Sequence, residues 1–570
     1  MPAAVRWLSV FTLSLLIAIA SSGCGDDKPA AQPGHKSTGT QAASGRPTES
    51  PCEGTLSTID EVFKLSKLGR TTTIGDGVLR LNDWQRTCAP TETPAPLPPE
   101  IEKLLTESQR KFLDEKRFLQ RDGEHLRDCL LDRAVSTYAP GSTGTELERV
   151  THLFEHIVRA IGLVPKPPQN LPLTPYEVYL LGKGTAEDRA WVFINVLKQL
   201  RIDAVLVLPH AEGEQSASAS AETPFLAGVL LDGQVYLFDS RAGVPIPARP
   251  GQAKSGTIPR PATLAEAAAD AAVLKQLDAG NSQPYPIAAA DLKQPEVAIV
   301  ADAAFWSPRM IGLQAQFVGA RALVIADPLA DTADGAPGLY HRIAKAGGDF
   351  WDASRIRVWD FPEKRLVAHA QMTKDQQEIL EEGQLGPFGA YKTIAVDARG
   401  QAALVDKEEH EDRAADGKLH PGVGIIKRTT AGAQMRARLD QLEGHFSQAV
   451  REYLEVRDKC RELLRFNIPI PEKFRHSRAD EDATYWTALC QFEQGEFKSA
   501  INTLVYYRKR PDAKNWQRES RYLLAISHAA DGNYPAAIAE LEPVEPDDLE
   551  YAGYQYLIRQ WQSASSATGH

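Results

Sequence analysis

The chain has 570 residues, of which 43% are apolar and 24% charged, and its formal net charge is -11. This composition is typical of a globular protein and excludes a fibrous or largely disordered chain. The acidic balance and the lack of a long basic stretch argue against nucleic acid as a partner. A chain of this length is expected to form about three or four domains.

The N-terminus has the pattern of an export signal. The uncharged apolar run at 7–20 is short for a membrane span and fits the core of a signal peptide. Small residues at 21–23 lead to Cys24, which resembles a bacterial lipobox, the site where a signal peptide is cut and the Cys is acylated. Ser21 stands where that motif usually has Leu. The polar stretch at 25–51, rich in Gly, Pro, Ser and Thr, predicts a flexible tether.

This resemblance implies a signal peptide at 1–24, lipidation of Cys24 and a location in the cell envelope facing the periplasm. Gly25, which follows the acylated Cys, fits sorting to the outer membrane. The membrane would then be a partner through the lipid anchor. The alternative is a plain secretory signal with a chance cysteine. No later run is long and apolar enough to span a bilayer.

Five further cysteines lack the spacing of a metal site, and we predict neither a metal nor another cofactor. They are Cys52, Cys88, Cys129, Cys460 and Cys490. In an oxidising compartment Cys52 and Cys88 could form a disulfide that closes the small segment 52–100, which ends in a Pro-rich linker. Buried free thiols are the alternative, and the odd number leaves at least one cysteine unpaired within the chain.

The stretch 101–260 predicts a helical lead-in followed by an α+β domain. Apolar residues at helical spacing predict a helix over 146–161, and a second amphipathic helix is expected over 186–200. A buried strand should follow at 204–209. Residues 225–240 then predict a β-hairpin that turns at its Asp-Gly pair.

Part of this stretch, 145–247, resembles the transglutaminase-like fold. Gly184-Thr185-Ala186-Glu187-Asp188-Arg189-Ala190 matches the family pattern G-x-C-x-[DE]-x-A, and the step 201–204 matches the family's entry into a strand. Thr185 is expected to cap the helix, with Asp188 completing a capping box. A thiol in the first turn would lose its proton readily at the helix N-terminus, and a His oriented by an Asp would accept that proton.

The resemblance places the three catalytic positions at Ala186, Pro224 and Asp239, so the Cys and the His are both absent. It therefore implies a domain without acyl-transfer activity. Asp239 is expected to cap a turn beside Arg241. Other residues could replace the missing Cys and His: His210 at the end of a strand, the Cys129 thiol within a helix, the Thr185 hydroxyl and the charged group 187–189. Residues of each kind are more often structural than catalytic.

Residues 261–430 alternate helix and strand patterns and contain no motif for chemistry. A helix is predicted over 263–278 with Thr263 as its cap. Strands are predicted at 297–301 and 322–327, with a helix between them. Residues 355–369 predict a further strand. The charged run 406–418 predicts a solvated loop.

Three stretches near the C-terminus share the pattern G-x-[FY]-x-x-A, and each has an alanine seven residues before its glycine. The repeated residues are Ala437, Gly444, Phe446 and Ala449, then Ala488, Gly495, Phe497 and Ala500, and then Ala525, Gly532, Tyr534 and Ala537. The glycines are 51 and then 37 residues apart, and the difference fits an insertion at 467–482. The pattern resembles the tetratricopeptide repeat, in which the small residues let two helices of a hairpin approach closely.

These features predict an α+β multidomain protein. Its parts are the signal peptide at 1–24, the tether at 25–51, a small segment at 52–100, a degenerate transglutaminase-like domain with its helical lead-in at 101–260, an α/β region at 261–430 and all-α tetratricopeptide-type repeats at 431–570. Large exported bacterial proteins of unknown function resemble it in combining these modules.

The combination implies a non-catalytic lipoprotein of the cell envelope whose repeats bind a protein or peptide on a concave surface. The alternative is an envelope hydrolase or acyltransferase with a non-standard active site. A third possibility is a structural envelope protein without a defined ligand.

Overall fold

A computed structural model describes residues 51–68, 72–88, 97–137, 144–164, 171–209, 224–249, 260–280, 283–389, 392–397, 402–406, 423–425 and 431–568. The stretch from Ser50 to His570 forms one compact unit, to which all statements below refer. Cys24, the rest of the predicted signal peptide and tether up to residue 50, and His210 lie outside the described residues.

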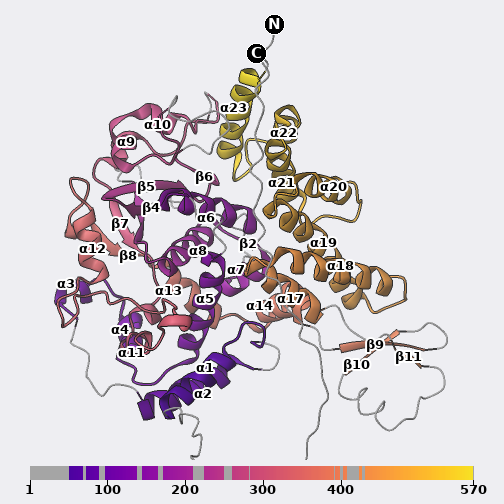
Figure 1. The fold of residues 1–570 in the computed structure, drawn as a ribbon, viewed down its shortest axis with the longest axis horizontal. Helices are drawn as coiled ribbons and strands as arrows, with labels where there is room; N and C mark the ends of the chain where they lie inside the picture. The colour runs from indigo at the N-terminus through magenta and orange to yellow at the C-terminus, as the bar shows by residue number, and fades with distance from the viewer. Residues whose placement is uncertain are drawn as a thin grey trace, which may run out of the picture. The chain divides into compact units, whose positions relative to one another are not determined.

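Eight helices among the described residues precede the main sheet (Figure 1). They are α1 (Pro51–Val62), α2 (Ile74–Cys88), α3 (Pro99–Glu102), α4 (Glu107–Asp114), α5 (Gln120–Thr137), α6 (Glu146–Ala160), α7 (Pro175–Leu181) and α8 (Ala186–Gln199). Two short strands, β1 (Gly162–Leu163) and β2 (Lys183–Gly184), pair in parallel. Helix α8 begins with the predicted capping box, in which Thr185 accepts from the backbone N–H of Asp188 and Asp188 accepts from that of Thr185.

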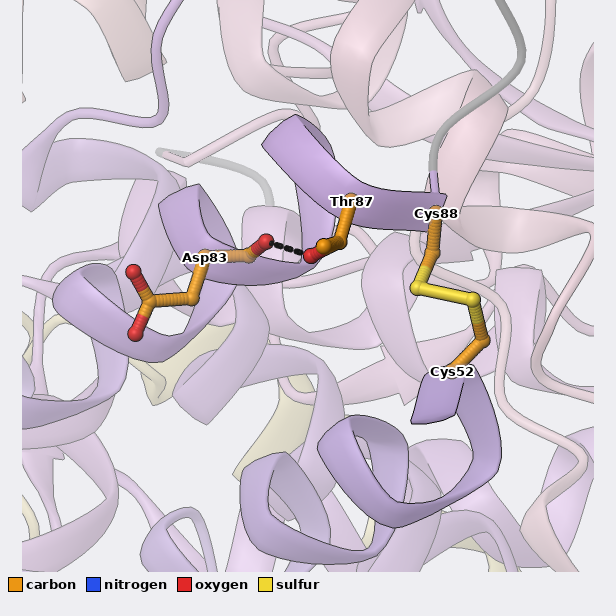
Figure 2. Close-up of a disulfide and its surroundings, with 4 residues drawn as sticks. All are labelled: Cys52, Asp83, Thr87 and Cys88. Carbon is orange, nitrogen blue, oxygen red and sulfur yellow. Dashed lines mark hydrogen bonds between the residues drawn. A yellow bond between two sulfur atoms is a disulfide. The ribbon is translucent and has the colours of Figure 1, made fainter. Parts of the chain in front are cut away.

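A disulfide between Cys52 and Cys88 joins the start of α1 to the end of α2 (Figure 2). The Cα atoms of the two cysteines are 5.6 Å apart. In the last turn of α2, the hydroxyl of Thr87 donates to the backbone carbonyl of Asp83. The apolar side of this hairpin includes Trp84. It packs in one hydrophobic cluster with residues of α5 and of the later segment 310–326.

The main sheet has six strands in the order β6-β5-β4-β3-β7-β8. They are β3 (Ala204–Leu208), β4 (Leu226–Leu231), β5 (Gln234–Asp239), β6 (Val244–Pro245), β7 (Glu296–Ile299) and β8 (Ile356–Val358). All neighbours are antiparallel except the parallel pair β7 and β8. The hairpin of β4 and β5 turns at Asp232 and Gly233, whose φ angles are 51° and 72°, as the Asp-Gly pair predicts.

The sheet crosses the boundary that was predicted at residue 260. Strand β3 pairs with β4 along one edge and with β7 along the other. The sequence pattern of an isolated strand does not reveal its second neighbour, so the partner at 296–299 was assigned to a separate region. The α/β residues up to β8 therefore complete the same sheet as the hairpin.

Helices cover both faces of this sheet. On β3, Leu206 and Leu208 belong to the hydrophobic cluster that includes α6 and α8, whereas Val205 and Val207 belong to the cluster that includes residues 262–292. Alternation with a period of two sends neighbouring side chains to opposite faces. The sheet is therefore buried on both sides.

The helices after the hairpin are α9 (Leu264–Ala269), α10 (Ala271–Lys275), α11 (Pro308–Gln314), α12 (Leu339–Ala346), α13 (Phe361–Ala370), α14 (Lys374–Glu378) and α15 (Gly386–Gly389). Shorter helical turns are η2 (Ala289–Leu292), η3 (Ala303–Trp306), η4 (Gly319–Arg321), η5 (Ala353–Arg355) and η6 (Ile379–Gln384). Thr263 caps α9 as predicted, but the predicted helix breaks at Asp270, which ends α9 and whose side chain caps α10. The strand pattern at 355–369 becomes β8 followed by α13.

The strand predicted at 322–327 is wrong, because these residues are extended without a strand partner. The side-chain amide of Gln199 exchanges hydrogen bonds with the backbone of Val324. The side chain of Gln314 accepts from the backbone N–H groups of Ile325 and Ala326. These side chains satisfy the backbone groups that a neighbouring strand would otherwise satisfy.

A second sheet of three strands, in the order β10-β9-β11, precedes the C-terminal helices. Its strands are β9 (Lys392–Asp397), β10 (Ala402–Asp406) and β11 (Val423–Ile425). The C-terminal helices are α17 (Ala431–Leu442), α18 (Phe446–Leu463), α19 (Ile470–Glu493), α20 (Phe497–Arg508), α21 (Gln517–Ala530), α22 (Tyr534–Leu541) and α23 (Tyr551–Thr568), orange to yellow in Figure 1. Among the described helices, none combines the length and apolarity needed to cross a bilayer.

Opening the disulfide should destabilise the hairpin of α1 and α2. The bond spans 36 residues, and closing a loop of that size is worth about 3–4 kcal/mol in the chain-entropy model. Reduction should therefore lower the melting temperature and speed limited proteolysis between the two cysteines. The double variant Cys52→Ser/Cys88→Ser should melt like the reduced protein and be insensitive to reductant. Equal sensitivity of both proteins to reductant would refute this assignment.

Candidate functional site

The C-terminal helices form three hairpins whose turns have the same geometry. Gly444, Gly495 and Gly532 have φ angles of 79°, 77° and 82°, a left-handed conformation that glycine adopts without strain. In each turn the residue after the glycine donates to a carbonyl five residues earlier, at distances of 2.7, 2.9 and 2.8 Å. This is the Schellman arrangement that ends a helix. The glycines of the repeat pattern are therefore the ends of α17, α19 and α21.

The small residues of the repeat pattern lie where the helices of each hairpin meet. All six alanines have no exposed surface, namely Ala437, Ala449, Ala488, Ala500, Ala525 and Ala537. Phe446 is buried. Phe497 packs against Phe492, with their ring centroids 5.4 Å apart. Tyr534 is half-buried against the hydrophobic cluster formed by α21, α22 and α23. The alanines therefore have the helix-packing role predicted from the pattern, and the aromatic residues add contacts within the same helices.

The predicted insertion at 467–482 lengthens the helices instead of forming a loop. Helix α18 has 18 residues and α19 has 24, against 12 for α20 and 8 for α22. The first turns of α19 pair with the end of α18, since Arg461 contacts Asp480 and Cys460 contacts His476. The antiparallel pair of α18 and α19, which connects the first hairpin to the second, is therefore longer than the helices that follow it.

The first helix of each hairpin contacts the α/β part of this chain. Arg438 of α17 donates to the carbonyl of Tyr179 at 2.6 and 2.9 Å. Glu493 at the end of α19 accepts from Arg159 at 2.9 Å and lies 3.1 Å from the ring of His156. These three contacts are buried on both sides.

The third hairpin and α23 continue this contact surface. Glu519 of α21 pairs with Lys183 at 3.0 Å, and the neighbouring Arg518 donates to the carbonyl of Leu163 at 2.8 Å. At Gly553 of α23 a Cβ atom would lie 1.9 Å from the carbonyl oxygen of Ala242, so only glycine fits. One hydrophobic cluster runs from α5 through α8 and the sheet into α17, α19 and α21. The face made by the first helices is therefore occupied by this chain itself.

Burial raises the pKa of Glu493, but the charges of Arg159 and His156 and their hydrogen bonds outweigh burial and hold the pKa well below its usual range. Glu493 is thus a carboxylate at any physiological pH. Arg159 of α6 and the carboxylate of Glu493 thus form an ion pair between α6 and α19, and such a pair is costly to leave half-made.

Arg189 is the most enclosed charge at this contact surface, with 1% of its side chain exposed. Its guanidinium donates to the carbonyls of Ile161 and Ser240 at 2.6 and 3.0 Å and to Glu550 at 2.8 Å. Asp188, the preceding residue, pairs with Arg365. The charged group at 187–189 therefore holds elements together, which is the structural interpretation given from the sequence.

Ala186, Pro224 and Asp239, the three positions singled out by the resemblance in sequence, lie near one end of the sheet. Ala186 is a buried residue in the first turn of α8, one turn before Arg189, which bonds to Ser240 next to Asp239. The register that pairs Ala227 with Phe238 brings Pro224 to the same end of the hairpin as Asp239.

Asp239 is fully engaged in structural hydrogen bonds. One carboxylate oxygen accepts from the backbone N–H groups of Arg241 and Ala242 at 2.8 and 3.0 Å. The other accepts from the hydroxyl of Tyr285 at 2.6 Å. The residue caps a turn, as its sequence context suggested, and Ala186 supplies no nucleophile.

A different thiol, imidazole and carboxylate come together on α5 and η3. His125 lies one helical turn before Cys129, and its Nε2 is 3.4 Å from the Cys129 sulfur. Its Nδ1 is 3.0 Å from the carboxylate of Asp302, which also caps η3. From the sequence, Cys129 was considered only as an isolated thiol, and its neighbours His125 and Asp302 were not recognised. The His-x-x-x-Cys spacing on one helix was visible, but nothing local pointed to Asp302.

This cluster is built as a buried ion pair and not as an exposed nucleophile. Burial lowers the pKa of His125, but the negative charge of Asp302 outweighs burial and raises the pKa well above its usual value. Burial raises the pKa of the Cys129 thiol, so the thiol stays protonated. The Nε2 of His125 also lies 2.8 Å from the carbonyl oxygen of Ile325, which accepts the proton that a protonated imidazole carries there.

The space beside these residues is too small for a substrate. It measures about 10 Å³, enough for about one water molecule, and includes Lys198, whose pKa burial lowers to about 8. Two larger cavities are described by the structure, one of about 330 Å³ at the β4–β5 turn and one of about 550 Å³ between α1, α5 and residues 317–323. None of the three has Ala186, Pro224 or Asp239 in its wall.

Two large apolar side chains at the start of α19 are exposed. Ile470 and Phe474 have 83% and 60% of their surface accessible, and their spacing of four residues puts them on one face of the helix. They lie in the predicted insertion at 467–482, at the start of α19. The apolar residues of this insertion were visible in the sequence but were not interpreted as a possible surface.

Comparison with protein families gives one match. The family described as anaphase-promoting complex, cyclosome, subunit 3 matches residues 467–544, which contain α19 to α22. The match supports helical repeats of the tetratricopeptide type in this segment, and such repeats generally mediate binding between proteins. Neither the curated proteins nor the solved structures give a match.

If Cys129 is structural, it should resist electrophiles in the folded protein. We expect iodoacetamide and fluorophosphonate probes to label no residue rapidly and stoichiometrically under native conditions, and iodoacetamide to label the free cysteines after unfolding. Mass spectrometry of digested protein measures both states. Rapid labelling of native Cys129, abolished in His125→Gln, would instead favour the alternative function of a hydrolase or acyltransferase.

Proposed function

We propose that the chain is a non-catalytic scaffold that holds a protein or peptide partner at the bacterial cell envelope. The observation that carries the proposal is the set of three hairpins with the same left-handed glycine turn, of which the second and third lie in the matched segment 467–544. Repeats of this kind use extended surfaces to bind other proteins. The scaffold combines these repeats with a transglutaminase-like domain that has lost its Cys and His.

The proposal assigns the repeats two separate surfaces. The first helices bind the chain's own α/β part through Arg438, Glu493 and Glu519, so this face is filled before any partner arrives. A partner is then expected at the start of α19, in the lengthened pair of α18 and α19, where Ile470 and Phe474 are exposed. Apolar side chains that remain exposed on a protruding helix are typical of a docking point.

A second function, hydrolysis or acyl transfer, is favoured only by the cluster of Cys129, His125 and Asp302. It requires α5 and η3 to separate, because about 10 Å³ of space admits no acyl substrate. The raised pKa of Cys129 also argues against a thiolate. The scaffold is therefore the stronger proposal.

The envelope location rests on Cys24 and the apolar run before it. A lipid on Cys24 would tether the compact unit through residues 25–50 and keep the repeats close to the membrane, in a periplasm-facing position at the outer membrane.

The partner surface can be tested by site-specific photocrosslinking in cells. A photoreactive amino acid at Lys473, which is exposed beside Phe474, should give one dominant covalent adduct. The charges introduced by Ile470→Asp/Phe474→Asp should reduce that adduct at least tenfold without lowering the melting temperature, since both side chains are exposed. Leu79→Asp, which changes an exposed side chain on α2, is the matched control and should leave the adduct unchanged. An adduct equally strong in all three proteins would exclude this surface.

The anchor can be tested separately in the native bacterium. Cys24→Ala should abolish incorporation of labelled fatty acid and move the protein from the membrane to the soluble periplasmic fraction. Cys129→Ala is a control that should keep both the lipid and the membrane fraction. Retention of the Cys24→Ala protein in the membrane would contradict lipidation as the means of attachment.

A further inference from the structure

The turn of the first hairpin brings together three groups that bind metals. Asp440 and Glu443 come from the end of α17, and His445 follows the turn glycine. One donor atom from each lies within 4.8 Å of the other two. The Nδ1 of His445 is 3.3 Å from an oxygen of Asp440 and 3.5 Å from an oxygen of Glu443.

These separations match a metal polyhedron. In a tetrahedral zinc site with bonds of about 2.0–2.2 Å, neighbouring ligand atoms lie about 3.3–3.6 Å apart. The two separations from His445 are in this range, and the oxygens of Asp440 and Glu443 lie within 4.8 Å of each other, so one cation could be reached by all three groups. Imidazole nitrogen together with carboxylate oxygen is a donor set that suits zinc and related divalent transition metals.

The turn itself does not require these side chains. The second hairpin makes the same turn with Gln491, Gln494 and Glu496 at the corresponding positions, and the third makes it with other residues again. Backbone hydrogen bonds close all three turns. The imidazole of His445 makes no capping hydrogen bond to α18. The three donors of the first hairpin are therefore available for another purpose.

The charges at this turn also favour a cation. Asp440 and Glu443 place two carboxylates close together beside the ring of His445. A divalent cation would compensate both carboxylates at once.

Glu443 and His445 form part of the wall of the cavity of about 550 Å³. The opposite walls come from α1, α5 and residues 317–323, and include the apolar side chains of Phe63, Leu126 and Phe317. The volume lies within the usual range for cavities that bind small molecules. A metal held by three protein ligands keeps a coordination position for a further group, and the cavity provides room for that group.

We infer that Asp440, Glu443 and His445 form a binding site for a divalent transition metal of the zinc class, with an open position at the rim of this cavity. All three ligands come from the first repeat hairpin, and residues of α1 line the same cavity. It is independent of the partner surface on α19, and neither proposal depends on the other.

The experiment is a titration of the full purified chain, without an affinity tag and after treatment with a chelator, with zinc chloride in a calorimeter. We expect one zinc ion per chain with a dissociation constant in the micromolar range, and a rise in melting temperature at saturation. His445→Ala and Asp440→Asn should each weaken binding at least tenfold. Both residues are partly exposed, so the metal-free melting temperatures should stay unchanged and show that the variants fold.

Glu496→Ala is the matched control, because it removes a carboxylate from the same turn position in the second hairpin and should bind zinc like the parent protein. X-ray absorption at the zinc edge should show nitrogen and oxygen ligands only. The inference is overturned by an absence of saturable binding, by equal binding in His445→Ala, or by sulfur in the zinc coordination shell, which would place the metal at a cysteine.

Discussion

The buried guanidinium of Arg189 joins elements from distant parts of the chain. It lies on α8 and bonds to the ends of α6 and β5 and to Glu550 just before α23. A buried cation is costly without a carboxylate, and removing one partner of such a pair typically costs about 3–5 kcal/mol. The α/β sheet and the helical repeats are therefore tied together by charge as well as by their shared hydrophobic cluster.

This constraint decides which surfaces are open for function. Arg189 stands one turn after Ala186, near the end of the sheet where Asp239 lies, and α23 packs there so closely that Gly553 has no room for a side chain. The C-terminal helices thus cover that end of the sheet. What they leave exposed is the start of α19, with Ile470 and Phe474, and the cavity beside the first turn.

Features set by neighbouring residues were predictable from the sequence. The turn glycines Gly444, Gly495 and Gly532, the Asp-Gly turn of the β-hairpin and the capping box of α8 each depend on a few consecutive side chains. The Cys52–Cys88 disulfide remained one of two alternatives, because spacing alone does not give the distance between two thiols. The candidate surface on α19 and the donors Asp440, Glu443 and His445 went unnoticed because their meaning depends on exposure and spatial grouping.

Features set by distant partners were not predictable. Residues 322–327 have the composition of a strand, yet the side chains of Gln199 and Gln314 take the hydrogen bonds that a strand would offer to a neighbour. Strand β3 finds its second neighbour at β7, after a long intervening segment. The role of Glu550 could not be inferred, since nothing in its local sequence points to Arg189.

The bond between Arg189 and Glu550 joins residues 361 positions apart. During synthesis or export the segment that contains α8 is delivered first, and its guanidinium has no carboxylate until the last helices arrive. Contacts of such long sequence separation form slowly, since the intervening chain must first be ordered. The hydrophobic cluster that α8 shares with α17, α19 and α21 is therefore complete only when the C-terminal helices have been delivered.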